Sequence, residues 1–499
     1  MRVRREKRAR LLAAGGQPYP VSVPRSHSLA EVRRDWAQLE TGSETTDVVG
    51  VAARVVFVRN TGKLCFATLQ EGLGAEGAAA DSTGDRLQVM ISLAEVGAES
   101  LAEWKAEVDL GDFVFVRGRV ISSRRGELSV LASAWQLASK ALRPLPTLHH
   151  ELSEENRVRQ RHVDLSVRPA AREMVKKRAG ITRSVRESLH REGFIEIETP
   201  TLQLVHGGAA ARPFRTHLNA FDIDMTLRIA LELFLKRAVV GGVERVYELG
   251  RIFRNEGIDG SHSPEFTMLE FYQAWGDQHS VAAITQQLII DIADALGSRV
   301  IQTPTGPIDL DGEWTWLGVY PGLSAVLGEE VTPETPETKL AKLAERHGLE
   351  LDLAAWPADV RAQKLVLELF GELVEPGLQQ PTFFCDYPPA AQPLARPHRN
   401  GAGLIEAWDL IIGGVERGTG FSELIDPVIQ RERLAAQSLA AAAGDLEAMQ
   451  LDEDFLAALE FGAPPMGGVG LGLDRVIMLF TGVGIRETIL FPLVKPGPG

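Results

Sequence analysis

The sequence predicts an α+β protein in which a small β-barrel precedes a larger domain of strands and helices. Short segments rich in Val, Leu and Phe, with turn residues between them, fill residues 47–137. From Pro169 onward, helical and strand-like patterns mix without a periodic repeat. A chain of 499 residues also exceeds what one compact core usually holds, so we expect two or more domains.

The composition is that of a folded protein with a packed core, at 44% hydrophobic and 24% charged residues. Cys65 and Cys385 are far apart, which excludes a disulfide framework or a cysteine zinc site and indicates a reducing cytoplasm. No apolar stretch of signal-peptide length follows the basic first ten residues, and no run of about 18 apolar residues predicts a membrane helix. We therefore expect a cytoplasmic location and no membrane partner.

Charge is unevenly distributed along the chain. The formal net charge is -14, but residues 1–150 carry +3 and the remainder carries -17. A polyanion would meet the N-terminal part more readily than the rest. A basic N-terminal arm is also often a solvated face, so the charge alone leaves this partner open.

The N-terminal third is expected to hold a helical extension over residues 1–45 and a barrel over residues 46–140. Arg4, Arg5 and Arg8 with Leu11 and Leu12 can form a short amphipathic helix. A helix is expected at 101–110, before the fourth strand. Five strands with one inserted helix are the make-up of an OB-type Greek-key barrel. The expected strands are 47–60, 63–70, 86–92, 112–122 and 127–137.

A linker is expected over residues 141–165, where two prolines precede a charged run, and a second domain over 166–499. A long helix is predicted from about Pro169, because apolar residues recur at four-residue spacing. Gly193 is expected to end it, and a strand is expected at 194–199. The apolar stripe consists of Ile181, Val185 and Leu189.

Residues 253–275 predict a hairpin with a polar tip. Arg254 and Glu256 lie where the first strand ends, before a loop rich in Gly, Ser and His. An arginine that points into a cleft can make paired hydrogen bonds to phosphate oxygens or to a carboxylate. A local ion pair between Arg254 and Glu256 explains the same spacing equally well.

A second arginine follows the glycine-rich stretch GGVGLGLDR, residues 467–475. These glycines let a backbone pass close to a ligand. Arg475 lies at the start of an apolar helix, where backbone amides favour an anion. A run of glycines often serves only to pack a strand on a helix, but the Asp-Arg that follows it favours phosphate binding.

Three acids, Asp409, Glu416 and Glu423, stand seven residues apart in each case. Carboxylate oxygens are the ligands that Mg²⁺ shared with a nucleotide requires. Odd spacing on one strand alternates faces, but the Gly413–Gly414 break changes direction and permits the three to converge. On spacing alone, ordinary surface acids are the simpler interpretation.

Three segments resemble the signature motifs of the class II aminoacyl-tRNA synthetases: GFIEIETP (193–200), FRNEG with SPEFTMLEFY, and GLGLDR. The resemblance covers nearly the whole chain. GGAAARPFRTHLNA (207–220), LRIALELFLKR (227–237) and RETILFP (486–492) are similar to the lysine-specific enzymes of this class, the lysyl-tRNA synthetases. The resemblance to this class implies an antiparallel sheet flanked by helices, and it implies a homodimer formed through the first motif.

The resemblance implies that L-lysine is activated with ATP to lysyl-adenylate and transferred to the 3′ end of tRNA(Lys). Arg254 would bind the α-phosphate and the lysine carboxylate, and Arg475 the outgoing phosphates. ATP would also contact Glu256, His262 and Phe266, and Mg²⁺ would be held by Asp409 and Glu416. The lysine pocket would comprise Gly208, Glu232, Glu270, Tyr272, Thr419 and Glu423.

This pocket composition suits lysine, which carries two ammonium groups that are costly to bury unless paired. A substrate without the ε-ammonium leaves the acids unpaired, which discriminates without an editing domain. Thr419 stands where the family more commonly has asparagine, and residues 385–399 also depart from the family pattern. Neither departure removes a catalytic charge.

The barrel, by the same resemblance, reads the anticodon, whose splayed bases stack on aromatic residues. Arg59, Phe66 and Glu127 match the expected positions. Two other functions remain possible: a ligase that passes lysyl-adenylate to a protein or small amine, and a non-catalytic RNA-binding protein. The barrel argues against the first, and the two arginines and the acids argue against the second.

Overall fold

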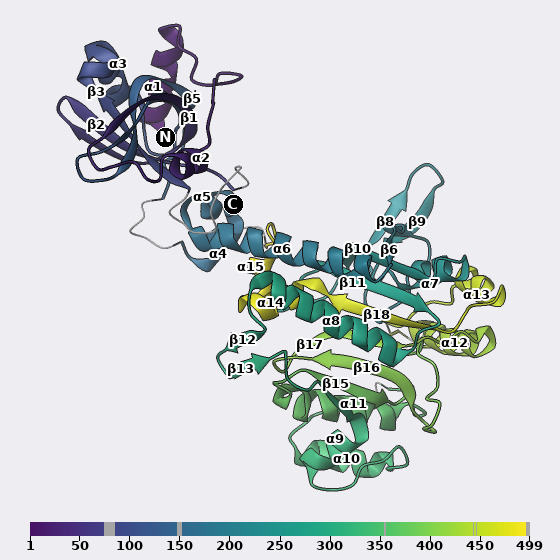
Figure 1. Ribbon diagram of the computed structural model, residues 1–499. Helices are drawn as coiled ribbons and strands as arrows, with labels where there is room; N and C mark the ends of the chain where they lie inside the picture. The colour runs from purple at the N-terminus through teal and green to yellow at the C-terminus, as the bar shows by residue number, and fades with distance from the viewer. Residues whose placement is uncertain (74–84, 147–151, 354–355, 443, 446, 496–499) are drawn as a thin grey trace. The chain divides into compact units, whose positions relative to one another are not determined.

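The computed structural model comprises two compact units, residues 1–172 and 173–499, which are described separately (Figure 1). The described residues are 1–73, 85–146, 152–353, 356–442, 444–445 and 447–495. Among them, no helix is long and apolar enough to cross a membrane.

The first unit contains a closed five-stranded barrel with the order β1-β2-β3-β5-β4. Side chains alternate between its interior and its surface, so Val49, Val51, Ala53 and Val55 of β1 are buried. The five predicted strands are confirmed. They are β1 (Glu44–Thr61), β2 (Leu64–Gln70), β3 (Arg86–Ser92), β4 (Phe113–Ser122) and β5 (Leu128–Ser139).

Helices α1 (Arg2–Ala13), α2 (Leu29–Asp35) and α3 (Leu93–Glu107) accompany the barrel. The expected start of α3 at residue 101 is wrong. Ser92 caps the helix by accepting a hydrogen bond from the Glu95 amide, so the helix begins eight residues earlier and kinks at a glycine with φ of 81°. Two short helices occupy the end of the expected linker region: α4 (Glu154–Arg159) lies within it, and α5 (Arg161–Val167) begins in it and ends two residues beyond it.

The second unit is built on an eight-stranded sheet with the order β14-β15-β16-β17-β18-β11-β10-β6. β10 pairs in parallel with β6 and β14 with β15, while the remaining neighbours are antiparallel. Its strands are β6 (Ile195–Glu196), β10 (Arg245–Phe253), β11 (Glu265–Ala274), β14 (Thr315–Gly318), β15 (Thr382–Tyr387), β16 (Ile405–Ile411), β17 (Glu416–Ser422) and β18 (Met466–Gly472).

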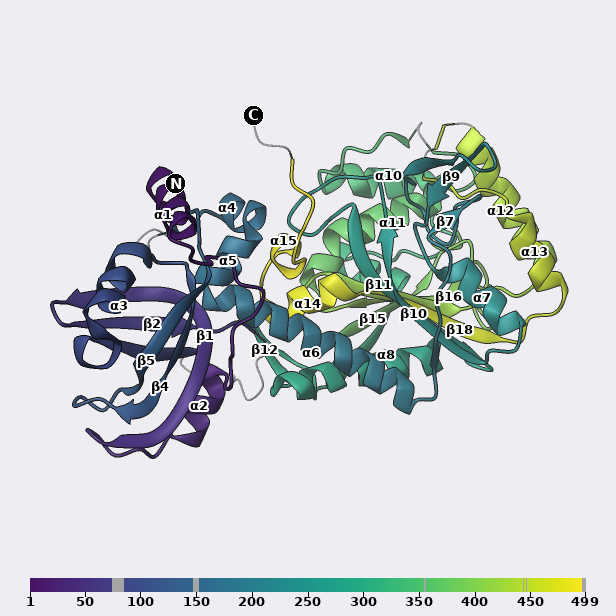
Figure 2. The same ribbon diagram turned by 90° about the horizontal axis from the view of Figure 1, so that it is seen from above.

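Helices cover both faces of this sheet (Figure 2). On β15, Phe383 packs with α6 (Pro169–Arg191), α8 (Gln278–Leu296) and α14 (Leu473–Thr481) on one face. The next residue, Phe384, packs on the other face with α9 (Val319–Leu327), α10 (Glu337–Arg346) and α11 (Arg361–Leu373). This alternation follows from the two-residue period of a strand. The remaining elements are α7 (Glu232–Val240), α12 (Pro427–Ala442), α13 (Glu453–Glu460), α15 (Ile485–Thr488), η2 (Glu375–Gly377), the hairpin β12 (Val300–Thr303) with β13 (Gly306–Asp309), and the small sheet of β7 (Leu202–Gln203), β9 (Ile223–Leu227) and β8 (Arg215–Leu218).

The predicted helix from Pro169 is confirmed, and its apolar stripe is fully buried. Gly193 follows it with φ of 81°. The strand expected at 194–199 is shorter than predicted, at Ile195–Glu196. Further along the chain, the amide and hydroxyl of Thr199 donate to the side-chain oxygen Glu248 Oε2, at 2.9 and 2.6 Å.

Candidate active site

The hairpin of β10 and β11 positions Arg254. The two strands pair from Arg245↔Gln273 to Phe253↔Glu265, as the sequence predicts for a hairpin with a polar tip. Beyond the last pair, the Arg254 amide donates to Pro264 O at 2.9 Å, and Arg254 Nε donates to Ile229 O at 3.3 Å. Its guanidinium lies 5.5 Å from the centre of the Phe266 ring. One of these hydrogen bonds fixes the Arg254 backbone and the other its guanidinium, which lies near the Phe266 ring.

A cavity of about 520 Å³ opens on the face of the sheet that packs with α9, α10 and α11. Alternate residues of β11 line it, because every second side chain of a strand faces the same way. The cavity brings together the predicted catalytic, ATP-binding and metal-binding residues and all the predicted lysine-binding residues except Glu423. These are Gly208, Glu232, Arg254, Glu256, His262, Phe266, Glu270, Tyr272, Asp409, Glu416, Thr419 and Arg475.

Arg475 lies in the first turn of α14, as the glycine-rich stretch before it predicts. Its Nη1 donates to Glu416 O at 3.3 Å and lies 3.5 Å from Glu416 Oε2. Its Nη2 is 3.2 Å from His262 Nε2 in the β10–β11 loop. One cation thus links β17, α14 and the hairpin loop at the cavity.

Glu270 and Tyr272 stand two residues apart on β11 and are both buried. Glu270 Oε1 accepts a hydrogen bond from the Leu231 amide at 2.9 Å, and Tyr272 donates its hydroxyl hydrogen to Glu270 Oε2 at 3.1 Å. Burial, together with the nearby charge of Glu232, raises the pKa of Glu270 to about 7. A cation placed beside this carboxylate would lower its pKa again and stabilise its charged form.

Glu423 and Lys236 do not line the cavity themselves, but both are buried beside Glu232, which does. Lys236 Nζ is 2.5 Å from Glu232 Oε1 and also pairs with Glu423 Oε2. Lys236 was not among the residues predicted from the sequence. The i, i+4 spacing of Glu232 and Lys236 on a helix was the available signal, but exposed pairs of this kind are common and rarely mark a site.

Asp409 and Glu416 lie on the neighbouring strands β16 and β17, whose turn contains two glycines with φ of 68° and 67°. Tyr387, which sequence analysis also missed, donates to Asp409 Oδ2 at 2.5 Å. Burial and the charge of Glu416 raise the pKa of Asp409 to about 7. Among the described residues, no group of three or more Asp, Glu, His or Cys side chains is arranged to hold a metal ion.

Thr419 pairs with Asp409 across the two strands, and its hydroxyl donates to Trp408 O at 3.3 Å. A threonine at this position therefore contacts the strand backbone from within the cavity wall.

The predicted anticodon residues lie in the barrel unit. Arg59 and Phe66 face each other across β1 and β2; the arginine is exposed and the phenylalanine half-buried. Glu127 is exposed just before β5, 3.6 Å from Arg33. The first two form one surface pair, and the third lies elsewhere on the barrel.

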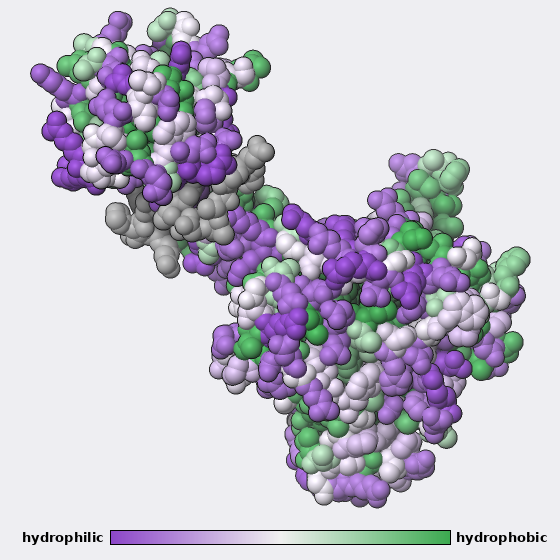
Figure 3. Space-filling view, viewed as in Figure 1, coloured by the Kyte–Doolittle hydropathy of each residue, from purple (hydrophilic) through white to green (hydrophobic). Residues whose placement is uncertain are grey.

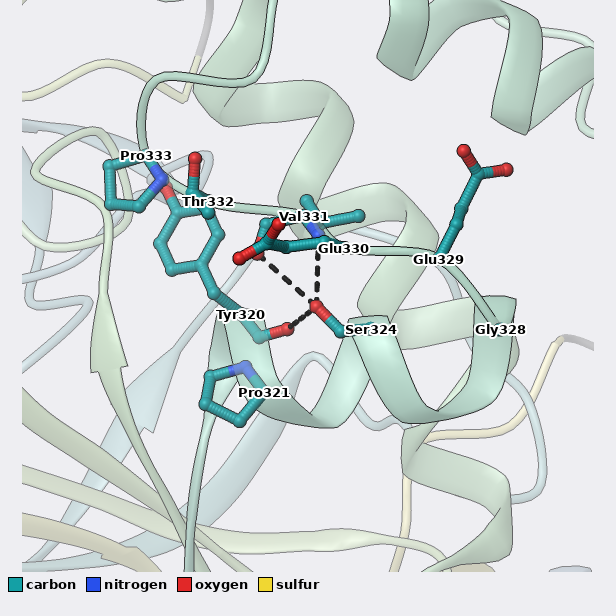
Figure 4. Close-up of a pocket in the computed structure, with 9 residues that line it drawn as sticks. All are labelled: Tyr320, Pro321, Ser324, Gly328, Glu329, Glu330, Val331, Thr332 and Pro333. Atoms are coloured by element: carbon teal, nitrogen blue, oxygen red, sulfur yellow. Dashed lines mark hydrogen bonds between the residues drawn. The ribbon is translucent and has the colours of Figure 1, made fainter.

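A second hollow, of about 580 Å³, lies between α9 and the segment that follows it (Figure 4). Ser324 donates its hydroxyl hydrogen to Tyr320 O at 2.7 Å and accepts the Val331 amide at 2.9 Å, so its polar groups serve to fix the loop. None of the predicted site residues lines it. The predicted site residues therefore line the first cavity and not this second hollow.

Comparison with known proteins agrees with this geometry. Residues 153–495 match the family described as "tRNA synthetases class II (D, K and N)", and residues 49–138 match "OB-fold nucleic acid binding domain". The lysine–tRNA ligase of Kineococcus radiotolerans is 58% identical over 99% of this chain and 97% of its own. The chain belongs to the class II lysyl-tRNA synthetases. Like them, it activates L-lysine with ATP and transfers it to tRNA(Lys).

Two further relatives match 99% of this chain. The lysine–tRNA ligase of Mycobacterium bovis (BCG) is 56% identical over 99% of this chain and 97% of its own. The lysylphosphatidylglycerol biosynthesis bifunctional protein LysX of Nocardia farcinica is 46% identical over 99% of this chain but only 42% of its own length. A stretch similar to this synthetase thus also occurs within a longer protein.

Proposed function

We propose that lysyl-adenylate forms in the cavity on the face of the sheet that packs with α9, α10 and α11. The observation that supports this most is that two arginines and a set of buried acids line one cavity. A guanidinium binds phosphate and carboxylate oxygens, and buried carboxylates bind ammonium groups. The cavity therefore suits a nucleotide at one side and a doubly cationic amino acid at the other.

In the first step, a carboxylate oxygen of lysine attacks the α-phosphorus of ATP in line, and the bond to pyrophosphate breaks. Arg254 would hold the lysine carboxylate and the α-phosphate together, and Arg475 would neutralise the pyrophosphate as it leaves. Glu256, His262 and Phe266 would position the nucleotide. In the second step, a terminal ribose hydroxyl of tRNA attacks the adenylate carbonyl and releases AMP. Positioning and charge stabilisation account for the chemistry, and we assign no general base.

Glu232, Glu270 and Glu423 would bind the two ammonium groups of lysine, with Tyr272 fixing the orientation of Glu270. Gly208 and Thr419 would complete the pocket wall. Gly208 has φ of 85°, and a methyl group there would lie 3.1 Å from Glu232 Cβ, so the glycine leaves room beside this acid.

Asp409 and Glu416 fit Mg²⁺ shared with ATP, because hard carboxylate oxygens are its preferred protein ligands and the nucleotide phosphates supply further oxygens. Such an ion would neutralise phosphate charge. The raised pKa of Asp409 is consistent with a carboxylate that lacks enough positive charge in the protein alone.

Residues 46–140 would then form the anticodon-binding domain and 166–499 the catalytic domain, with an extension at 1–45 and a linker at 141–165. Arg59, Phe66 and Glu127 would contact the anticodon. We further propose a cytoplasmic location, which the two free, buried cysteines support.

A homodimer through the first motif is also proposed. The residues just beyond α6 expose apolar side chains that a partner copy could cover: Ile195 is 57% exposed and Leu204 66%. Figure 3 also shows hydrophobic side chains at the tip of the β8–β9 hairpin, where Phe221 is 74% exposed. Sedimentation equilibrium measures the oligomeric state directly.

The test is lysine-dependent ATP–pyrophosphate exchange with Arg254→Ala. Exchange is expected to fall at least about 1000-fold, because a charge-assisted contact to the reacting phosphate is lost, while the melting temperature changes little. Arg251→Ala is the matched control, since Arg251 lies on the same strand, 42% exposed in its side chain, and pairs with Glu265 at 3.7 Å.

Near-normal exchange by Arg254→Ala would contradict its role. With the unsubstituted protein, exchange without tRNA charging would indicate a ligase with another acceptor. Absence of exchange would indicate an RNA-binding protein without activity.

A further inference from the structure

Lys236 occupies an unusual place for a lysine, since it is only 1% exposed and lies beside two acids of the proposed amino-acid pocket. Its ammonium pairs with Glu232 at 2.5 Å and with Glu423. The rings of Phe421 and Tyr272 lie 5.4 and 6.0 Å from it. A buried ammonium is rarely kept without a specific partner, and this one has two.

The charge balance of the proposed lysine pocket explains why Lys236 is buried there. Glu232, Glu270 and Glu423 carry three negative charges when ionised, whereas the substrate brings two ammonium groups, its carboxylate being assigned to Arg254. Lys236 leaves a net charge of two negatives among the acids. The protein therefore contains the cation that matches the pocket to its substrate.

Lys236 pairs with only one oxygen of Glu423. This is Oε2, and apart from that ion pair neither of the two buried oxygens of Glu423 has a hydrogen-bond partner among the described residues. A buried, unpaired carboxylate oxygen is costly and calls for a donor. The ammonium of a bound lysine supplies one.

We propose that Lys236 is a positioning residue of the amino-acid pocket, a permanent counter-ion that keeps Glu232 and Glu423 ionised and oriented toward the substrate ammonium groups. This inference rests on the proposed lysine pocket. Lys236 touches neither ATP nor the reacting atoms in that scheme, so its effect belongs to lysine binding and not to the chemical step.

Titration of the surrounding groups agrees with this role. Burial raises the pKa of Glu423 well above its ordinary value, and Lys236 opposes that rise. Burial also raises the pKa of Glu232, again opposed by Lys236. For Lys236 itself, burial lowers the pKa, but the two carboxylates outweigh it and the ammonium stays charged. Glu270 and Tyr272 are the other titratable groups that face this cluster.

The experiment measures lysine-dependent ATP–pyrophosphate exchange with Lys236→Met, which preserves length and removes the charge. The KM for lysine is expected to rise about tenfold or more, while the KM for ATP and kcat change less than about threefold. The pH below which the lysine KM increases should move upward by about one unit, because the acids lose their counter-ion. Lys236→Arg should recover part of the affinity.

Arg237→Met is the matched control. It removes a cation from the next position of the same helix, one that stacks on Phe234 and has no carboxylate partner among the described residues. A folded Lys236→Met with unchanged lysine KM and pH profile would overturn the inference. If the unsubstituted enzyme shows no lysine-dependent exchange, the proposed function fails instead.

A second comparison applies where Lys236→Met does not fold. Glu232→Gln/Lys236→Met removes one charge of each sign, and Glu232→Gln alone is its reference. The double variant should show the upward shift of the pH profile relative to the single one, since Glu423 has lost Lys236. Identical profiles in the two variants would overturn the inference.

Discussion

Among the pocket residues, Glu270 has the environment that best explains the proposed selectivity for lysine. Its carboxylate is 3% exposed and accepts hydrogen bonds from a backbone amide and from Tyr272. These neutral donors orient the group but do not balance its charge. A bound ammonium would do both.

The raised pKa of Glu270, about 7, predicts a pH dependence for lysine binding. Lysine keeps its ε-ammonium charged throughout the neutral range. Above pH 7 the free enzyme presents an ionised Glu270, and below it the protonated acid must lose its proton before it can pair. The KM for lysine should therefore rise as the pH falls below about 7, by up to about tenfold per unit.

The check is the pH profile of kcat/KM for lysine, with that for ATP measured alongside. A lysine profile that is flat between pH 6 and 8 would contradict the ionisation assigned to Glu270.

At the scale of the element, β18 leaves room for the pocket because four of its seven residues are glycine. It lies between β11 and β17, where Gly468 is opposite Tyr272 and Phe421. A methyl group on Gly468 would collide with Glu423 Oε1 and with the Tyr272 ring. The glycine is required here by close approach and not by its backbone angles.

Gly468→Ala is accordingly expected to displace Glu423 and Tyr272 and to raise the KM for lysine about tenfold or more, with a smaller effect on the KM for ATP. Gly470→Ala is the comparison on the same strand, since its methyl group would lie 3.8 Å from Glu270 Cγ, an ordinary contact. Steady-state exchange kinetics decide the matter. Equal effects of the two substitutions would mean that crowding at Glu423 is not the cause.

Elements with a strong period were predictable from the sequence. The apolar stripe of α6 is buried as its four-residue spacing predicts, because the helix period follows from backbone geometry. The five barrel strands also lie where the apolar segments separated by turn residues predict them. The start of α3 was not predictable from apolar period alone: the cap at Ser92 and the kink at Gly97 determine it. Capping depends on one side chain and its local hydrogen bond.

Contacts between distant segments were harder to predict. Nothing in the spacing of Tyr387 and Asp409 indicates that they bond, because the pairing of β15 with β16 brings them together. The positions of Arg254 and Arg475 were predicted from motif resemblance, and the cavity that contains both arises from the sheet order. Lys236 could not be predicted, because the sequence spacing of an i, i+4 pair does not indicate whether the pair is exposed or buried.

At the scale of the whole molecule, the chain has two compact units, an OB-fold unit for RNA binding and a class II unit for the chemical reaction. Each has its own core: one lies inside the barrel, and others lie on the faces of the large sheet. Units with separate cores can lose one function without the other.

Phe66→Ala tests this separation. Phe66 is half-buried on β2, and in its proposed role the ring is a stacking surface for a base, worth about 1–3 kcal/mol. We expect tRNA charging to weaken by about tenfold or more in kcat/KM for tRNA, with lysine-dependent exchange unchanged. Val48→Ala, which shortens an exposed side chain elsewhere on β1, serves as the control. Loss of exchange in Phe66→Ala would show that the barrel is not a separable reader.

The central claim is that buried carboxylates in the cavity recognise lysine, and the KM for lysine in Glu270→Gln measures it most directly. Removing one partner of a buried ion pair costs about 3 kcal/mol, so the KM should rise about 100-fold or more, with the KM for ATP nearly constant. Glu265→Gln, at the exposed end of the same strand, should leave both values unchanged. A lysine KM in Glu270→Gln equal to that of the unsubstituted enzyme would contradict the account.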